Sequence, residues 1–237
     1  MKKLIAALLL SCVTYLPAFA DIVHIPADQD TTLIEDADGA LSNGAGPAFF
    51  AGRTNQSMFS IRRALLRFDV AAALPENALI DRVFLTLYQG SNNVTPSDVS
   101  LHLVLADWGE GASFSGGGGG AAAEPGDATW LHTFHDYDYW VQQGGLFVPH
   151  ASATTIVLGK GFYTWASTVF LENNVLLWLQ APEHNYGWLV MGDEDTRGSV
   201  KSFYSRECFD AAVEDKYKCA GTDQRPMLTI EYHLPGE

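Results

Sequence analysis

Apolar and polar residues alternate with a period of two along much of this 237-residue chain. In residues 78–88, Val83, Leu85 and Leu87 fall on one face, and residues 99–105 alternate in the same way. Successive side chains of a β-strand point to opposite faces, so this period indicates strands with one buried face. The runs are short and are separated by clusters of Gly, Pro, Asn and Ser. The pattern favours an all-β fold, an antiparallel β-sandwich or jelly roll.

Two further runs fit the same period. The first has an inward-facing row of Ala64, Leu66, Phe68 and Val70, with Arg63, Arg67 and Asp69 on the opposite face. The second, residues 228–232, forms a terminal strand.

One segment departs from the period. Residues 171–179 carry apolar side chains at a spacing closer to that of a helix, and Pro182 follows. We therefore expect one short helix packed against the sandwich. Residues 116–123 are rich in Gly and Ala and predict an exposed, mobile loop.

The first 20 residues resemble a secretory signal peptide. Lys2 and Lys3 precede an apolar stretch, and the small-x-small sequence at residues 18–20 predicts cleavage before Asp21. A membrane anchor is the alternative, but the stretch is short and Pro17 interrupts it. A lipoprotein box ending at Cys12 is only faintly matched. The sequence therefore predicts a secreted, extracellular protein that does not span a membrane, with residues 21–237 as one domain.

The mature chain is strongly acidic. Without Lys2 and Lys3 it has 12 basic and 28 acidic residues, a formal charge of −16. Nucleic acid is excluded as an expected partner, because phosphate binding needs a basic face. Clustered carboxylates suit divalent cations, and Asp28, Asp30, Asp193 and Glu194 are candidate ligands for a structural Ca²⁺. The alternative is that they form a solvated acidic face.

Cys12 leaves with the signal peptide, so Cys208 and Cys219 remain in the mature chain. In an oxidising compartment two such cysteines are expected to pair. A loop of this length gains about 3 kcal/mol of stability from closure in the chain-entropy model. Two free thiols are the alternative if the geometry does not permit the bond.

No catalytic motif is found in the sequence. The G-x-S-x-G, H-E-x-x-H and P-loop patterns are absent. His132 and His135 have a spacing that puts them on opposite faces of a strand unless a turn intervenes, so a surface pair of histidines is favoured over a metal site. We therefore predict a protein that is not an enzyme.

Aromatic residues in a polar segment suggest a different kind of site. Tyr137, Tyr139 and Trp140 lie among His and Asp residues, where they could stack on the apolar faces of sugar rings. The alternative is that such rings are core pillars of the sandwich. We expect a core position for four other tryptophans, which are Trp108, Trp165, Trp178 and Trp188.

Charged residues also occur within strand-like runs. Arg67, Arg206 and Glu207 could simply occupy an outer face, or they could form a partly buried network of Arg and carboxylate that fixes strand register. We favour the structural network over a binding site, because buried ionic groups must be paired.

Taken together, a set of short motifs along nearly all of the mature sequence resembles the DNRLRE-domain family of secreted modules. The motifs are residues 30–36, 42–46, 51–53, 63–70, 74–75, 99–102, 107–111 and 126–130, Trp140, residues 144–145 and 178–179, Pro182, and residues 185–188, 205–207 and 225–226. The string that names the family is absent, and the cysteines are particular to this chain. The resemblance implies a jelly-roll-like β-sandwich similar to carbohydrate-binding modules, with relatives linked to alginate-like or matrix polysaccharides and no established catalytic residues.

These observations lead to one expected function and one alternative. The first is a secreted, non-catalytic module that binds extracellular polysaccharide through aromatic stacking and hydrogen bonding. The alternative is a structural or adhesive protein of the matrix or cell surface with no small ligand.

Overall fold

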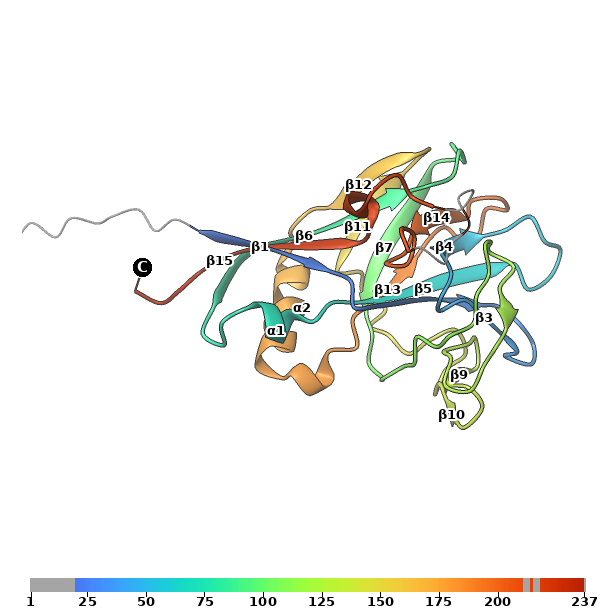
Figure 1. Ribbon diagram of the computed structural model, residues 1–237, viewed down its shortest axis with the longest axis horizontal. Coiled ribbons are helices and arrows are strands. Elements are labelled where there is room, and N and C mark those ends of the chain that lie inside the picture. Colours follow the sequence, from blue (N-terminus) through green and yellow to red (C-terminus); the bar gives the residue numbers. More distant parts are fainter. Residues whose placement is uncertain (1–19, 211–213, 215–217, 237) are drawn as a thin grey trace, which may run out of the picture.

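The computed structural model describes residues 20–210, 214 and 218–236, and the predicted signal peptide lies outside the described residues except for Ala20. Antiparallel strands dominate (Figure 1). Their bounds are β1 (Asp21–Pro26), β2 (Gln29–Ile34), β3 (Leu41–Ser42), β4 (Ala48–Arg53), β5 (Ile61–Arg67), β6 (Leu79–Gln89), β7 (Ser97–Leu103), β8 (Ala121–Ala122), β9 (His132–Phe134), β10 (Asp138–Tyr139), β11 (Ala153–Val157), β12 (Gly161–Trp165), β13 (Trp188–Met191), β14 (Lys201–Tyr204) and β15 (Met227–His233). The helices are α1 (Val70–Ala73) and α2 (Val169–Gln180), with 3₁₀ turns at Pro182–His184 and Thr222–Gln224.

The strands form two layers that share a core. In the first sheet, β6 lies between β12 on one side and β15 and β14 on the other, and β1 pairs with β15. In the second sheet the order is β2, β5, β13, β7 and β11. The all-β sandwich expected from the period of two is therefore confirmed.

Strand β4 connects the two layers. Residues 48–51 pair with β14 of the first sheet, whereas Gly52 and Arg53 pair with β5 of the second. The strand changes layer at Gly52, which has φ of +113°. A Cβ at this glycine would lie 3.0 Å from the Val200 Cα. Only glycine combines this backbone conformation with so close an approach, so the position ties the layers together.

The main core fills the space between the two sheets. Val83, Leu85 and Leu87 of β6 face Leu66 of β5 and Val190 of β13, and all five are fully buried. Helix α2 contributes buried Leu171, Val175, Trp178 and Leu179, and the ring of Trp178 lies 4.4 Å from that of Trp188. The predicted helix is confirmed at residues 169–180. Thr168 begins it by accepting a hydrogen bond from the Leu171 amide, and Pro182 follows its end.

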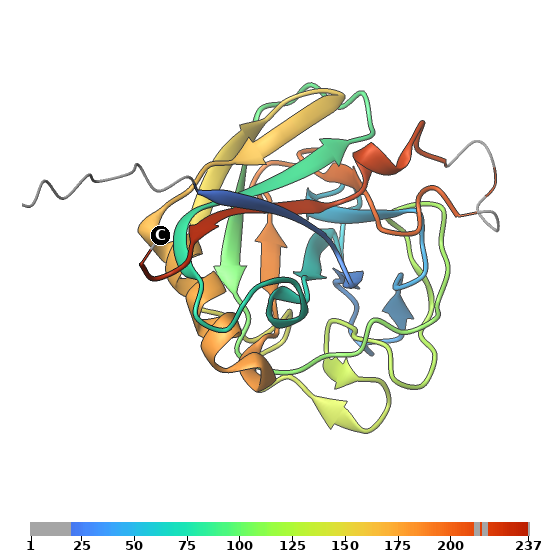
Figure 2. The ribbon, with the colours of Figure 1, turned by 60° about the vertical axis from the view of Figure 1, so that its left-hand side comes forward.

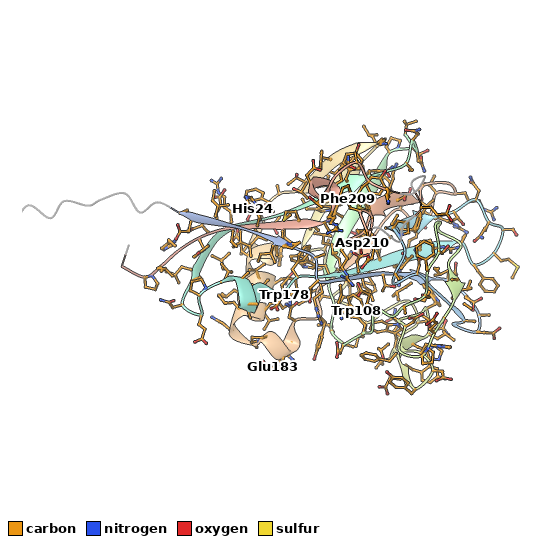
Figure 3. The ribbon with its side chains drawn as sticks, in the orientation of Figure 1. His24, Trp108, Trp178, Glu183, Phe209 and Asp210 are labelled. Carbon is orange, nitrogen blue, oxygen red and sulfur yellow. A yellow bond between two sulfur atoms is a disulfide. The ribbon has the colours of Figure 1, made fainter. Side chains whose placement is uncertain are left out.

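A second core lies on the outer face of the second sheet. Its buried members are Leu33, Leu65, Val104, Trp108, Ala128, Trp130, Trp140 and Leu189. Figure 3 shows Trp178 on α2 and Trp108 away from it, in keeping with their assignment to separate clusters. Strand β5 is therefore buried on both faces, since Ala64 and Leu66 point into the main core while Leu65 points into the second. The alternation of β5 is as predicted, but its second face is not simply a solvated row of charges.

Two other expectations need correction. Helix α1 was not predicted, and Asp69, which was placed on a strand face, begins it by accepting a hydrogen bond from the Ala72 amide. The Gly-rich segment at residues 116–123 is not a free loop, because β8 pairs with β3 and the Gly118 carbonyl accepts a hydrogen bond from Arg62.

Within the part of the chain that the structure describes, no helix has the length and apolar character needed to cross a membrane.

Candidate functional site

The β9–β10 hairpin projects from the lower edge of the molecule in both ribbon views (Figures 1 and 2). Tyr137 and Tyr139 are 62% and 64% exposed on it. Tyr137 stacks on Phe134 with ring centres 5.9 Å apart, and Tyr139 lies 4.3 Å from the ring of His132. His132 and Phe134 of β9 thus each pack against one of the two tyrosines. The hairpin presents two exposed aromatic rings to solvent.

Trp140 is buried, whereas stacking on a sugar requires an exposed ring. Its side chain is only 6% exposed and belongs to the second core. The indole Nε1 donates to the Thr129 carbonyl oxygen at 2.9 Å, and the backbone amide donates to Leu131. A ring with so little exposed surface leaves no face open for stacking on a sugar, so Trp140 has the alternative role of a core residue. Trp140 anchors the hairpin that carries the two tyrosines.

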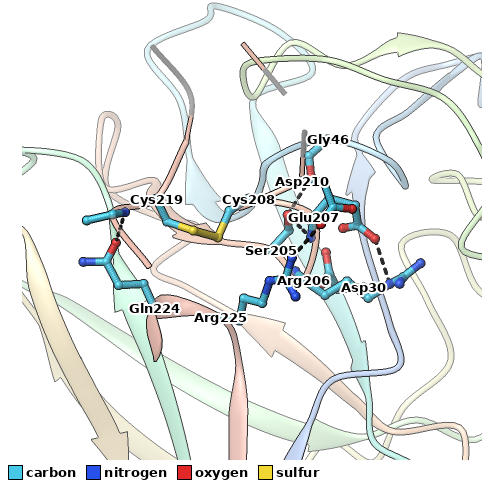
Figure 4. Close-up of a disulfide and its surroundings, with 11 residues drawn as sticks. Asp30, Gly46, Ser205, Arg206, Glu207, Cys208, Asp210, Cys219, Gln224 and Arg225 are labelled. Atoms are coloured by element: carbon cyan, nitrogen blue, oxygen red, sulfur yellow. Dashed lines mark hydrogen bonds and ion pairs between the residues drawn. A yellow bond between two sulfur atoms is a disulfide. The ribbon is translucent and has the colours of Figure 1, made fainter. Parts of the chain in front are cut away.

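Arg206 and Glu207 belong to a group of charges that we call the carboxylate cluster, made of Asp30, Glu110, Arg206 and Glu207. The Arg206 guanidinium donates to both oxygens of Glu110 at 2.7 and 2.6 Å and lies 2.8 Å from Glu207 Oε1. The Arg206 amide donates to Asp30 Oδ2 at 2.8 Å, and the Asp30 amide donates to Glu110. Figure 4 shows Asp30, Arg206 and Glu207 beside the disulfide. The cluster thereby joins β2, the loop after β7 and the end of β14.

Burial of the cluster changes its protonation. Loss of solvent raises the pKa of Asp30 well above its usual value, and the charge of Glu207 raises it further. The pKa of Glu207 is raised to about 7, mainly by burial, although Arg206 opposes this shift. Hydrogen bonds to Glu110 raise the pKa of Arg206, so the guanidinium stays charged. Three carboxylates around one arginine are therefore accommodated by partial protonation.

We expect the contribution of Glu207 to the free energy of unfolding to fall as the pH rises from about 4.5 to about 7. Its pKa is about 7 in the folded protein against an ordinary value of 4.5 for a glutamate. In this window the unfolded state releases the proton while the folded state keeps it, so deprotonation favours unfolding. Urea unfolding at several pH values measures the effect. Glu207→Gln should have a flatter profile and should exceed the wild type in stability at pH 8, and parallel profiles would contradict the assignment.

The remaining charged residues singled out in the sequence form two separate ion pairs. Arg67 binds Asp28 at 2.6 Å, so it is paired but is not part of the carboxylate cluster. Glu194 binds Arg63 through two hydrogen bonds of 2.7 and 3.0 Å. Arg63 also lies over the Trp130 ring at 5.0 Å. Arg63 was not proposed as a partner for Glu194, because nothing in the sequence connects positions 131 residues apart.

The four candidate calcium ligands do not form one set of oxygens. Asp28 and Glu194 each bind an arginine, Asp30 is buried in the carboxylate cluster, and Asp193 Oδ1 accepts hydrogen bonds from the amides of Asp195 and Thr196. The Thr196 side chain, together with the amides of Thr196 and Asp195, lowers the pKa of Asp193 by hydrogen bonding. Among the described residues, no group of three or more His, Cys, Asp and Glu side chains is arranged to hold a metal ion. Calcium binding stays a prediction.

An open cavity of about 620 Å³ lies on the outer face of the second sheet, beside the Asp193 turn. Its lining combines Met191 and Ile156 with the carboxylates of Asp98, Asp193, Glu194 and Asp195.

Ser100 also lines the cavity, and the Ser100 hydroxyl contacts His102 Nε2 at 2.9 Å. His102 Nδ1 contacts the Val148 carbonyl at 3.0 Å, and burial lowers the pKa of His102. This pair was not identified from the sequence, although spacing i, i+2 on a strand could have suggested it. The acidic lining disfavours anionic ligands.

The predicted disulfide between Cys208 and Cys219 is confirmed. The two Cα atoms are 5.4 Å apart, and both side chains are buried. Cys208 directly follows Glu207, so the bond constrains the segment that carries the carboxylate cluster.

Comparison with known proteins gave no match to any protein-family model and no match to a curated protein. The resemblance to the DNRLRE-domain family therefore depends on the sequence motifs alone.

Proposed function

We propose that the mature chain is a secreted module that binds extracellular polysaccharide, with Tyr137 and Tyr139 as contact residues. The observation that carries this proposal is the exposure of both rings on one anchored hairpin. A pyranose has an apolar face and polar edges, so it suits a tyrosine ring flanked by hydrogen-bonding groups. Asp136 and Asp138 are adjacent and can accept hydrogen bonds from sugar hydroxyls.

The charge of the chain narrows the class of polysaccharide. A formal charge of −14 for the full sequence, with only 14 basic residues, disfavours polymers of uronic acids. We therefore propose binding to neutral chains ahead of the alginate-like polymers that the family resemblance implies. Export follows from the signal peptide expected at residues 1–20.

Binding to a panel of soluble neutral and acidic polysaccharides tests the proposal. Replacing Tyr137 and Tyr139 together by alanine is expected to weaken binding about thirtyfold, because each stacked ring contributes about 1 kcal/mol and the two together about 2 kcal/mol. Isothermal titration calorimetry measures the change. Phe170→Ala, which removes an exposed ring from α2, serves as the control and should bind like the wild type. If the wild type binds no polysaccharide of the panel, the proposal is wrong.

A further inference from the structure

A row of three aromatic side chains crosses the outer face of the first sheet. It consists of Phe162 of β12, Tyr88 of β6 and Tyr204 of β14, and we call it the aromatic strip. Phe162 pairs directly with Tyr88 across the two strands. Leu87, Gln89 and Phe203, the immediate chain neighbours, are fully buried. Because successive residues of a strand alternate between faces, the three rings of the strip point away from the core.

The rings of the strip touch one another. Phe162 meets Tyr88 edge to face with ring centres 4.8 Å apart, and Tyr88 stacks on Tyr204 at 5.5 Å with nearly parallel planes. Phe162 is 52% exposed, although it lies within a strand, and the two tyrosines are partly exposed. Mutual packing fixes the rings before any ligand arrives, which lowers the entropy cost of binding.

Hydrogen-bonding groups accompany the rings. Thr86 and Thr164 form the next cross-strand pair on the same face, with their hydroxyl oxygens 3.1 Å apart. The phenolic hydroxyls of Tyr88 and Tyr204 form no hydrogen bond with the other described residues. They are available to a ligand. Ring faces next to free hydroxyls match the apolar faces and polar edges of sugars.

The strip is also uncharged. It contains no Asp, Glu, Lys, Arg or His side chain, in a chain with 28 acidic and 14 basic residues. The rings and threonines of the strip offer no cation to an anionic chain, whereas a neutral chain requires none. In addition, β12 pairs with β6 and ends the first sheet on that side.

We propose that the aromatic strip is a second binding site of this protein, for a chain of neutral sugars laid across β12, β6 and β14. This proposal rests on the proposed polysaccharide-binding function and adds a site separate from the β9–β10 hairpin. Stacking on Phe162 holds the chain at the edge of the sheet, and the hydroxyls of Tyr88 and Tyr204 bind its polar groups.

The test compares variants of the full mature chain for binding to cello-oligosaccharides and soluble β-glucan, as neutral probes, and to alginate. Phe162→Ala is expected to weaken binding to a neutral probe at least fivefold, and Tyr204→Phe two- to threefold. Phe170→Ala is the matched control, since this phenylalanine is 47% exposed on α2, and it should have no effect. Phe162→Leu keeps an apolar side chain and removes only the ring, so it should lose affinity as Phe162→Ala does. Melting temperatures verify that each variant is folded.

The outcomes separate the strip from the hairpin. Loss of affinity in both Phe162 variants supports the strip. Unchanged affinity in these variants, with loss in the Tyr137 and Tyr139 variant, overturns the strip and leaves the proposed function standing. Tighter binding of alginate than of the neutral probes overturns the neutral class of ligand. No binding to any probe by the wild type overturns both proposals.

Discussion

Replacing Trp140 with alanine is expected to lower the free energy of unfolding by about 3–5 kcal/mol, the range for large aromatic residues removed from a core. The indole is 6% exposed, packs in the second core and donates to the Thr129 carbonyl. The substitution leaves a cavity and also a buried carbonyl oxygen without its donor. Chemical denaturation, followed by tryptophan fluorescence and circular dichroism, measures the loss.

Tyr139→Ala is the control for this prediction. The two residues are adjacent and aromatic, but Tyr139 lies mostly in solvent, so its removal should change stability by less than about 1 kcal/mol. The two variants should also separate stability from binding. Under the proposed function, Tyr139→Ala is expected to weaken sugar binding in a stable protein, whereas Trp140→Ala is expected to affect binding only through the fold. Equal stability of the two variants would refute the pillar role of Trp140.

The strands of the main core were predictable because each has one buried face. Val83, Leu85 and Leu87 follow a strict period of two, and that period alone separates core from surface. The same rule failed at Leu65, because the opposite face of β5 is covered by a second core. The covering segment contains Trp108, Trp130 and Trp140 at irregular spacing. Without a period, their burial depends on contacts with distant strands that no local pattern reveals.

The candidate sites were predictable only in part, for a related reason. The sequence predicted sugar contact at Tyr137, Tyr139 and Trp140 alike. The two tyrosines are exposed, but Trp140, with the same composition around it, is buried. Arg206 and Glu207 were identified as a network, whereas Glu110 is 96 residues from Arg206 in the chain and was missed. The aromatic strip was missed because its rings come from three strands, and cross-strand pairing is a property of the register rather than of any single run.

Arg206→Ala is expected to destabilise the protein by about 2–3 kcal/mol at pH 8. Breaking a fully buried ion pair costs about 3–5 kcal/mol, and the 40% exposure of the Arg206 side chain reduces this through solvent screening. The variant leaves Asp30, Glu110 and Glu207 close together without a cation. Arg82→Ala is the control, since Arg82 lies mostly in solvent at 3.9 Å from Glu231, and it should cost less than about 1 kcal/mol.

The pH dependence distinguishes this electrostatic role from simple loss of packing. Without the guanidinium, the pKa values of Glu207 and Asp30 should rise further, because Arg206 lowers both. The folded variant therefore binds more protons, and its deficit relative to the wild type should shrink as the pH falls toward 5. Adding Glu207→Gln to Arg206→Ala removes one of the unpaired carboxylates and should restore part of the stability at pH 8. A deficit that is constant between pH 5 and pH 8, or a double variant as unstable as the single one, would show that Arg206 acts by packing and not by balancing the charge of the carboxylate cluster.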